Sequence, residues 1–98
     1  MTIKTFQSED QLTLVITGRV DTTTSPELEE EISKSIDDIK NLTLDFSDVE
    51  YISSAGLRVL LSTQKKMNRQ GNMKVVHCNS TVLDVFEVTG FKDILTIE

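Results

Sequence analysis

Hydrophobic and polar residues alternate near the start of the chain, and the alternation predicts two strands. In "QLTLVIT", residues 11–17, the alternation and the β-branched side chains indicate a strand that ends before Gly18. Residues 3–7 show a weaker pattern of the same kind, and Ser8-Glu9-Asp10 would form the turn between the two strands. We therefore expect an N-terminal antiparallel hairpin.

The period of the pattern changes to that of a helix in "DTTTSPELEEEISKSIDDI", residues 21–39. Ser25 can cap a helix, Pro26 suits its first position, and the glutamates that follow favour the positive end of the helix dipole. Apolar residues then recur at spacings of four and three, which predicts one buried stripe formed by Leu28, Ile32, Ile36 and Ile39.

Strands and helices continue to alternate in the second half of the chain. The third helix would carry Val82, Val85, Phe86 and Val88. The expected elements are a strand at 42–46, a helix from about Ser54 to Gln70 ended by Gly71, a strand at 73–77, a helix capped by Ser80 and ended by Gly90, and a last strand in "DILTIE", residues 93–98.

This order, β-β-α-β-α-β-α-β, predicts a single α/β domain over residues 1–98. Its sheet would be mixed but mostly parallel, with the hairpin at one edge and the helices mainly on one face. In the parallel part, the loops that follow the strands meet at the carboxyl edge of the sheet. These loops span roughly residues 18–25, 47–53 and 78–80, so we expect Asp21, Ser53, Ser54 and Asn79 near one another.

Charge and composition limit the cell compartment and the binding partners that we expect. The 98 residues carry a net charge of −6, which argues against binding to nucleic acid phosphates. The one cysteine, Cys78, cannot form an internal disulfide, and the N-terminus lacks the layout of a signal peptide. No apolar stretch reaches the length of a membrane-spanning helix. We therefore expect a cytoplasmic protein that binds no nucleic acid and no membrane.

The serine pair in "YISSAGLRVLL" allows two interpretations. One is that Ser53 or Ser54 caps the helix that follows, which typically contributes about 1 kcal/mol. That interpretation explains one serine, but it explains the second serine and the adjacent Ala55-Gly56 less well. Small residues at a helix start also permit close approach of another backbone or of a phosphate group.

The string "LTLDFSDVEYISSAGLRVLL" resembles the central motif of the STAS-domain anti-sigma factor antagonists, which are switched by phosphorylation of one serine. A second segment, "TGRVDTTTSPEL", is similar to an upstream motif of the same family, and the family's element order covers essentially the whole chain. The matching positions are Asp45, Ser54, Ala55, Gly56 and Leu57 in the central motif, and Gly18, Val20, Asp21, Ser25 and Leu28 upstream.

The family has an Asp immediately before its phosphorylated serine, and this sequence has Ser53 there. Alignment through Gly56 and Leu57 favours Ser54 as the phosphorylated residue, with Ser53 as the alternative.

The resemblance implies a binding module without catalytic residues, metal or cofactor. Its unphosphorylated form would bind an anti-sigma factor that has serine kinase activity and so free a sigma factor, and a phosphatase would reset the phosphoserine. The alternative within the family is a STAS module of another signalling scaffold or of a transporter-associated complex.

The helix expected after the serine pair carries a basic stripe opposite its apolar face. Arg58, Ser62, Lys65 and Arg69 recur at spacings of four, three and four. The stripe is either a contact surface for an acidic partner or an ordinary solvated helix face. The expected partner-binding residues are Asp21, Ser53, Ser54, Gly56, Arg58, Ser62 and Lys65.

A small serine hydrolase is a less favoured reading, with Ser54, His77 and Asp21 as its catalytic residues. Neither serine of the pair lies in a Gly-x-Ser-x-Gly motif, which argues against it. His77 and Cys78 have no further histidine or cysteine beside them to complete a zinc site.

Overall fold

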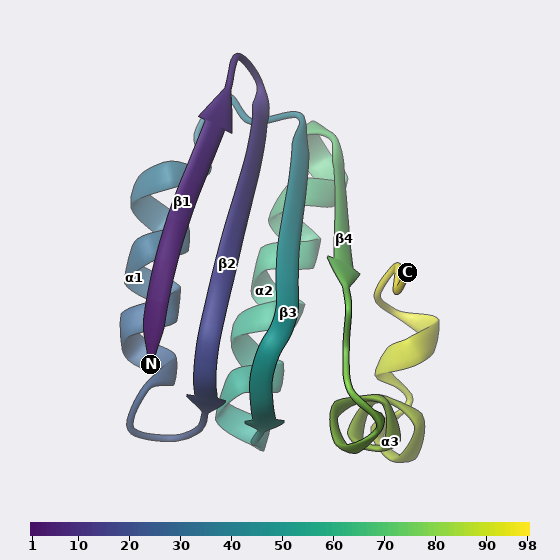
Figure 1. Cartoon of the computed structure of the whole chain (residues 1–98). Helices are drawn as coiled ribbons and strands as arrows, with labels where there is room; N and C mark the ends of the chain where they lie inside the picture. Colours follow the sequence, from purple (N-terminus) through teal and green to yellow (C-terminus); the bar gives the residue numbers. More distant parts are fainter.

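One layer of the protein is a four-stranded mixed sheet (Figure 1), seen in a computed structural model that describes residues 1–98. β1 pairs with β2 antiparallel, whereas β2 with β3 and β3 with β4 pair parallel. The predicted hairpin and the mostly parallel sheet are therefore confirmed. In spatial order, the strands are β1 (Thr2–Ser8), β2 (Gln11–Val20), β3 (Asn41–Ile52) and β4 (Asn72–Val76).

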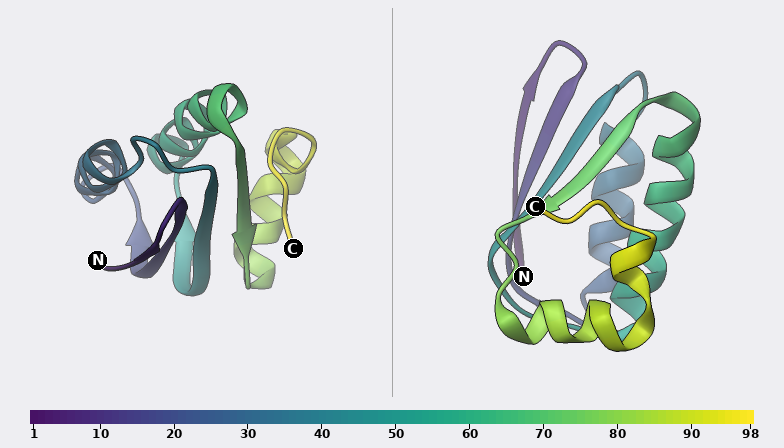
Figure 2. Two further views of the ribbon diagram at one scale, coloured as in Figure 1. Left: turned by 90° about the horizontal axis from the view of Figure 1, so that it is seen from above. Right: turned by 90° about the vertical axis from the view of Figure 1, so that its right-hand side faces the viewer.

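The second layer consists of α1 (Ser25–Ser35) and α2 (Ser54–Gln70), which cover the same face of the sheet (Figures 1 and 2). The third helix, α3 (Ser80–Thr89), runs across the carboxyl end of the sheet, and the short 3-10 turn η1 (Phe91–Asp93) follows it. The prediction that helices lie mainly on one face is confirmed. None of the helices combines the length and the hydrophobicity needed to cross a membrane.

The hydrophobic core fills the space between the sheet and the two covering helices. Alternate residues of β2 and β3 point into it, and the alternation leaves the opposite face of the sheet more polar. Full burial of one large aliphatic or aromatic side chain contributes roughly 1.5–3 kcal/mol. The largest fully buried side chains are Leu12, Leu14, Ile16, Leu28, Ile36, Ile39, Leu42, Leu44, Phe46, Ile52, Leu60 and Phe86.

Two central strands run further than the sequence pattern predicts. β2 continues through Gly18 to Val20, and β3 continues from the predicted end at residue 46 to Ile52. The extensions pair with each other after register shifts in the ladder, and Gly18 adopts a φ of 106° there. Most of the predicted loop at 47–53 is therefore strand, stabilised by the buried side chains of Val49 and Ile52.

The predicted last strand in residues 93–98 is wrong. Its first residue belongs to η1, and the only ladder contact of this segment is an isolated parallel bridge between Val75 and Ile97. Two backbone hydrogen bonds hold the bridge, one from the Val75 N–H to the Thr96 oxygen and one from the Glu98 N–H to the Val75 oxygen. The C-terminal segment therefore covers only the end of the short edge strand β4.

Two predicted helix caps are wrong by one residue. Thr24, not Ser25, is the N-cap of α1, and the Ser25 hydroxyl instead donates to the backbone oxygen of Asp21. Asn79, not Ser80, caps α3, because its side-chain oxygen accepts the N–H of Val82 at 2.8 Å. Asparagine and serine are comparably good N-caps, so residue type alone does not separate adjacent candidates.

Two other predictions about helix residues have different outcomes. Gly71 does end α2, but its backbone is extended rather than left-handed. Glycine is needed there because a Cβ would collide with the carbonyl oxygen of Lys40. In α3, Val82 and Phe86 are buried as expected, whereas Val88 is 86% exposed and lies outside the core.

Candidate functional site

The residues singled out in the sequence lie at the carboxyl edge of the sheet, at the bottom of Figure 1. Asp21 follows β2, Ser53 and Ser54 follow β3, and Asn79 precedes α3. The Ser53 N–H donates to the Val20 oxygen at 2.8 Å, which joins the start of α2 to the end of β2. The Asn79 side-chain amide donates to the Val49 oxygen at 2.9 Å, which joins α3 to β3.

The turn after β2 is closed by its own polar side chains. The Asp21 carboxylate accepts the backbone N–H groups of Thr23 and Thr24, at 3.0 and 3.1 Å. The Thr24 hydroxyl donates to the Arg19 oxygen at 2.7 Å and accepts the Asp21 N–H at 2.9 Å. This turn therefore orients the entry into α1, and the Asp21 carboxylate holds its centre.

The hydrogen bond from the Thr24 N–H, with further help from the Thr24 hydroxyl, the Thr23 N–H and the Arg19 charge, lowers the pKa of Asp21 below its ordinary value of 3.8. Asp21 is therefore ionised at neutral pH.

Arg19 lies beside this carboxylate and stacks on Tyr51, and the sequence pattern did not predict either residue. The Arg19 guanidinium lies 3.8 Å from the Asp21 carboxylate and 4.9 Å from the centroid of the Tyr51 ring. The two side chains meet because Arg19 and Tyr51 are partners in the extended β2–β3 ladder. A guanidinium over an aromatic face is favourable, so this stack stabilises the outer end of the ladder.

Ser53 occupies the N-cap position of α2 but does not use its side chain as a cap. Its backbone is extended, with φ −98° and ψ 176°, and its hydroxyl oxygen is buried without a hydrogen-bond partner. The simple interpretation that Ser53 is a helix-capping side chain is therefore wrong.

Ser54 differs from Ser53 in its accessibility. It is the first residue of α2, it is exposed, and its hydroxyl takes part in none of the side-chain hydrogen bonds of the protein. Free backbone N–H groups and the positive end of the helix dipole characterise a helix start. Of the two serines, Ser54 thus presents its hydroxyl to solvent in a setting that suits negative charge.

Gly56 is buried where α2 packs against the ends of β2 and β3. A Cβ at this position would lie 2.7 Å from the Ile52 side chain, 2.8 Å from the Val20 side chain and 3.1 Å from the Val20 oxygen. The first turn of α2 can approach the sheet this closely only with glycine at residue 56. Gly56 therefore sets the position of Ser54 relative to the sheet.

The predicted basic stripe is exposed along α2, as its spacing implies for a face opposite the core. Arg58, Ser62, Lys65 and Arg69 all lie on the surface, and none of them forms an ion pair. Arg58 also lines a small cavity of about 230 Å³ between α2 and the start of α1. The basic groups nearest Ser54 are thus available to an outside partner.

The residues of the hydrolase alternative do not form a catalytic triad. His77 pairs with Asp45, at 3.2 Å, and Asp21 is held in its own turn. Burial opposes ionisation of Asp45, but hydrogen bonds from Ser47 and His77 outweigh it and lower its pKa below the ordinary value. Half-burial raises the pKa of the Cys78 thiol to about 11, so this thiol is a packing group with little thiolate at neutral pH.

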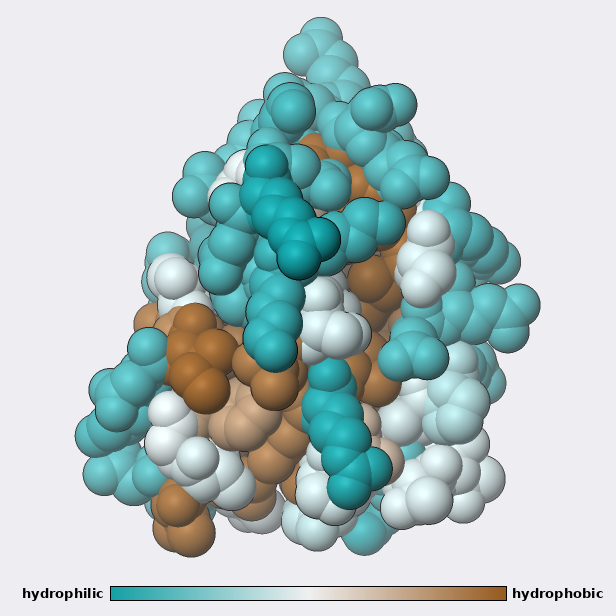
Figure 3. Space-filling view, turned by 180° about the vertical axis from the view of Figure 1, so that it is seen from behind, coloured by the Kyte–Doolittle hydropathy of each residue, from teal (hydrophilic) through white to brown (hydrophobic).

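Apolar side chains are exposed near the other end of the carboxyl edge. Leu83 and Val88 of α3, and Ile94 just after η1, are 42%, 86% and 46% exposed. In the rear view, brown side chains show at the lower left, where α3 and the segment that follows it lie (Figure 3). A partner seated at this edge would therefore meet charged groups on α2 and apolar groups on α3.

Comparison with known proteins identifies the class. The fold matches the crystal structure of an anti-sigma factor antagonist from Mycobacterium paratuberculosis with a TM-score of 0.89 at 25% identity, covering 98% of this chain and 83% of that one. It is thus the mixed-sheet fold of a small regulatory α/β domain. The sequence matches the STAS domain over residues 2–98, and the chain belongs to that family.

Two relatives show how similar this sequence is to other members of the family. The anti-sigma-B factor antagonist of Bacillus subtilis is 30% identical over 92 residues, covering 93% of this chain and 84% of the relative. The Bordetella bronchiseptica protein BtrV, provisionally named an anti-sigma factor antagonist, is 32% identical over 91 residues. That alignment covers 91% of this chain and 78% of BtrV.

Proposed function

We propose that this protein is an anti-sigma factor antagonist controlled by phosphorylation of Ser54. In its unphosphorylated form it binds an anti-sigma factor that has serine kinase activity, and the sigma factor is released. A phosphatase removes the phosphate and restores binding. The named roles of the relatives support the antagonist function. Because this circuit acts on transcription, we assign the protein to the cytoplasm.

The observation that carries the proposal is the difference between the two adjacent serines. The Ser53 hydroxyl is buried, whereas Ser54 is exposed at the first position of α2. A kinase must reach the hydroxyl that it modifies, so the difference supports Ser54 over Ser53. The loss of the family's Asp at position 53 does not alter this access.

Phosphorylation would change the surface much more than the fold. A phosphoserine carries about −1.5 to −2 charge at neutral pH, and a helix N-terminus tolerates such a charge. The same edge already carries the ionised Asp21. A partner that fits the neutral serine would then meet a bulky dianion in a more negative surface, and its affinity would fall.

The proposed binding surface contains two groups of residues. One group holds the edge of the sheet in shape, and the other is exposed and can contact a partner. Asp21, Ser53 and Gly56 shape the edge from within it, through the turn, the Val20 contact and the close packing of α2. Ser54, Arg58, Ser62 and Lys65 are exposed on one side of α2. We assign the direct contacts of the partner to this second group.

The test is a phosphorylation assay on the purified protein with the serine-kinase anti-sigma factor from the same cell, followed by mass spectrometry of the modified site. We expect phosphate on Ser54, loss of incorporation in Ser54→Ala, and full incorporation in the matched control Ser53→Ala. Ser54→Ala should still bind the anti-sigma factor, whereas Ser54→Asp and the phosphoprotein should bind more weakly, the phosphoprotein most of all.

Two results would contradict the proposal. Incorporation that survives Ser54→Ala and disappears in Ser53→Ala would move the switch to Ser53. Stable binding to a signalling scaffold or transporter, without any binding to an anti-sigma factor, would instead assign the protein to the other branch of the family.

A further inference from the structure

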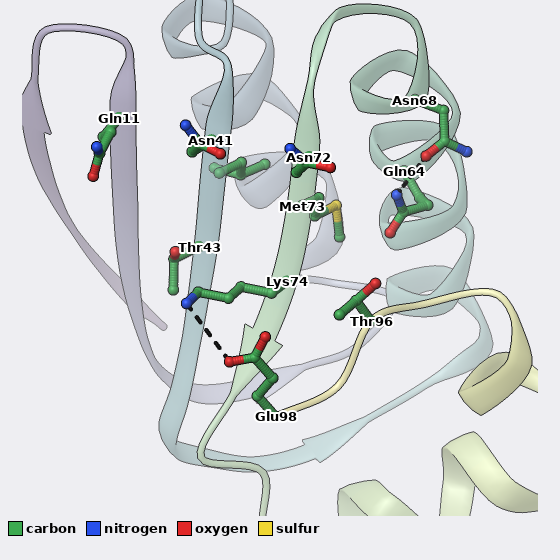
Figure 4. Close-up of a pocket in the computed structure, with 11 residues that line it drawn as sticks. Gln11, Asn41, Thr43, Gln64, Asn68, Asn72, Met73, Lys74, Thr96 and Glu98 are labelled. Atoms are coloured by element: carbon green, nitrogen blue, oxygen red, sulfur yellow. Dashed lines mark hydrogen bonds and ion pairs between the residues drawn. The ribbon is translucent and has the colours of Figure 1, made fainter.

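A cavity lies away from Ser54, beside β4. Its volume is about 560 Å³, and only two of its eleven lining residues are hydrophobic (Figure 4). It is lined by the C-terminal half of α2, with Gln64 and Asn68, and by β4, with Asn72 and Met73, and it extends to the first residues of β2 and β3. Thr96 closes the lower end. We call this space the β4 groove.

Gln64 is an unusual residue in the wall of the β4 groove. Its side chain is almost wholly buried, with 6% of the residue exposed, and it points from α2 toward β4 (Figure 4). Its amide nitrogen donates to the Asn68 side-chain oxygen at 2.8 Å, but its own oxygen is buried without any partner. A buried carbonyl oxygen without a donor is destabilising, so this group is suited to receive an N–H from outside the chain.

The backbone of β4 offers a second unpaired group to the β4 groove. The Asn72 N–H points toward β3 and donates to the Lys40 oxygen, whereas Val75 points the other way and pairs with the C-terminal segment. Because direction alternates along a strand, Met73 points the same way as Val75. No segment of the chain lies beside Met73 as Thr96–Glu98 lies beside Val75, so the Met73 N–H and C=O face the groove unpaired.

We propose that the β4 groove binds an extended peptide segment of a partner protein by strand addition to β4. The peptide would pair with Met73 and lie in line with Thr96–Glu98, which already pairs with the lower half of the same edge. A backbone N–H of the peptide would supply the donor that the Gln64 oxygen lacks, once this side chain, which is buried in the free protein, turns toward the peptide. Strand addition draws its affinity from such main-chain hydrogen bonds.

The charge of the groove favours a neutral segment. Lys74 and Glu98, the charged residues of the lining, pair with each other at 3.6 Å. The remaining polar lining residues carry amides and hydroxyls, which match a peptide backbone better than they match an ion. This binding would be independent of the proposed switch, because the groove lies at the opposite end of α2 from Ser54.

A second copy of this chain fits the β4 groove less well than a peptide does. Two copies related by a two-fold axis would have to pair through Met73 alone, since the next outward-facing residue, Val75, is already occupied. Pairing through one residue of a five-residue strand is far from the interface of about 1,200 Å² or more that stable dimers bury. A peptide would also pair with β4 only at Met73, but it is narrow enough to enter the groove beside Gln64 and does not have to bring a second folded domain up to this edge.

The test uses NMR with the isotope-labelled full chain and the neutral heptapeptide acetyl-Thr-Val-Thr-Val-Thr-Val-Thr-amide, titrated to millimolar concentration. We expect shifts of the Met73 backbone amide and the Gln64 side-chain amide, with the Ser54 amide unchanged. The same peptide N-methylated at every residue cannot donate main-chain hydrogen bonds and should cause no shifts.

A matched pair of substitutions on α2 separates binding from folding. Gln64→Met keeps the size of the side chain but removes the unpaired oxygen, so it should raise the melting temperature and weaken peptide binding about tenfold. Gln70→Met is the control, because the Gln70 amide donates to the Ile36 and Ile39 oxygens at 2.9 and 2.7 Å. It should lower the melting temperature and leave peptide binding unchanged.

Three results would overturn the strand-addition proposal while leaving the Ser54 assay unaffected. They are an absence of shifts at Met73 and Gln64, equal peptide affinity in Gln64→Met and the unsubstituted protein, and Met73 shifts that follow protein concentration without peptide. The last result would assign the groove to a second copy of the chain.

Discussion

In the turn after β2, the Asp21 carboxylate and the hydroxyls of Thr24 and Ser25 are all hydrogen-bonded, whereas in the adjacent first turn of α2 neither serine uses its hydroxyl. Both regions lie at the same edge, and a backbone hydrogen bond from Ser53 to Val20 connects them. The polar groups of the turn are all used in hydrogen bonds that stabilise the fold, whereas the exposed Ser54 hydroxyl at the start of α2 remains free to react. This difference separates residues expected to change stability from residues expected to change binding.

The largest effect should come from filling the space that joins the two regions. Gly56→Val should lower the free energy of unfolding by roughly 2–3 kcal/mol, because the added atoms collide with Val20 and Ile52. Chemical denaturation monitored by circular dichroism measures this change.

Gly56→Ala provides a sharper version of the same test. In an open helix position, replacing glycine by alanine stabilises by about 1 kcal/mol. At residue 56 we expect a loss instead, since even one Cβ lies within 3 Å of two side chains. A gain in stability would mean that α2 can move away from the sheet, and the proposed positioning role of Gly56 would be wrong.

A smaller loss of stability should follow from opening the turn after β2. Asp21→Ala removes the acceptor for the N–H groups of Thr23 and Thr24 and should lower the melting temperature at pH 7. Because folding lowers the pKa of Asp21, its contribution is present above the ordinary value of 3.8 and is lost as the pH falls through the lower folded value.

The difference in melting temperature between the Asp21→Ala variant and the unsubstituted protein should therefore shrink at strongly acidic pH. A difference that stays constant from neutral pH to pH values below 3.8 would show that the Asp21 charge does not hold the turn.

Reversing the basic stripe should affect binding rather than folding. Arg58→Glu combined with Lys65→Glu should leave the melting temperature nearly unchanged, since both side chains are exposed and unpaired. The same change should slow association with an acidic anti-sigma factor surface, most strongly at low salt. Stopped-flow association rates across a salt series measure this effect, and rates equal to those of the unsubstituted protein would make the stripe an ordinary solvated face.

The smallest effect on stability is expected at Ser53. Replacing an N-cap serine by alanine typically costs about 1 kcal/mol, but the Ser53 hydroxyl forms no cap hydrogen bond. Ser53→Ala should therefore leave the melting temperature unchanged or raise it slightly, because it removes a buried oxygen without a partner. A clear loss of stability would show that this hydroxyl does cap α2 in solution.

Much of the fold could be predicted because its strands and helices repeat a local pattern. The hairpin, the buried Leu28 and Ile32 of α1 and the length of α2 follow from residues close together in the sequence. Ile36 and Ile39 of the predicted stripe are also buried, but they follow the end of α1 at Ser35 and do not belong to the helix. The outer parts of β2 and β3 could not be predicted in this way, because "GRV" and "SDVEYI" contain glycine and several polar residues. They become strands by pairing with each other, which a local pattern does not reveal.

The location of the site could be predicted from the sequence, but the accessibility of each serine and the Arg19–Tyr51 contact could not. The order of strands and helices places Asp21, Ser53 and Ser54 at one edge, as the structure does. Which serine is accessible depends on the backbone, since Ser53 is extended and Ser54 is already helical. The Arg19–Tyr51 stack was missed for the same reason as the long strands, because it requires the register of their extensions.

The hydrogen bond from the Ser53 N–H to the Val20 oxygen has a consequence for how fast the protein could respond. This bond and the tight packing of Gly56 fix the first turn of α2 to the sheet. The proposed phosphate on Ser54 would therefore be added without a movement of this turn relative to the sheet. A regulator of this kind needs no slow structural relaxation between its two forms. Its response time would equal the turnover time of the proposed kinase and phosphatase.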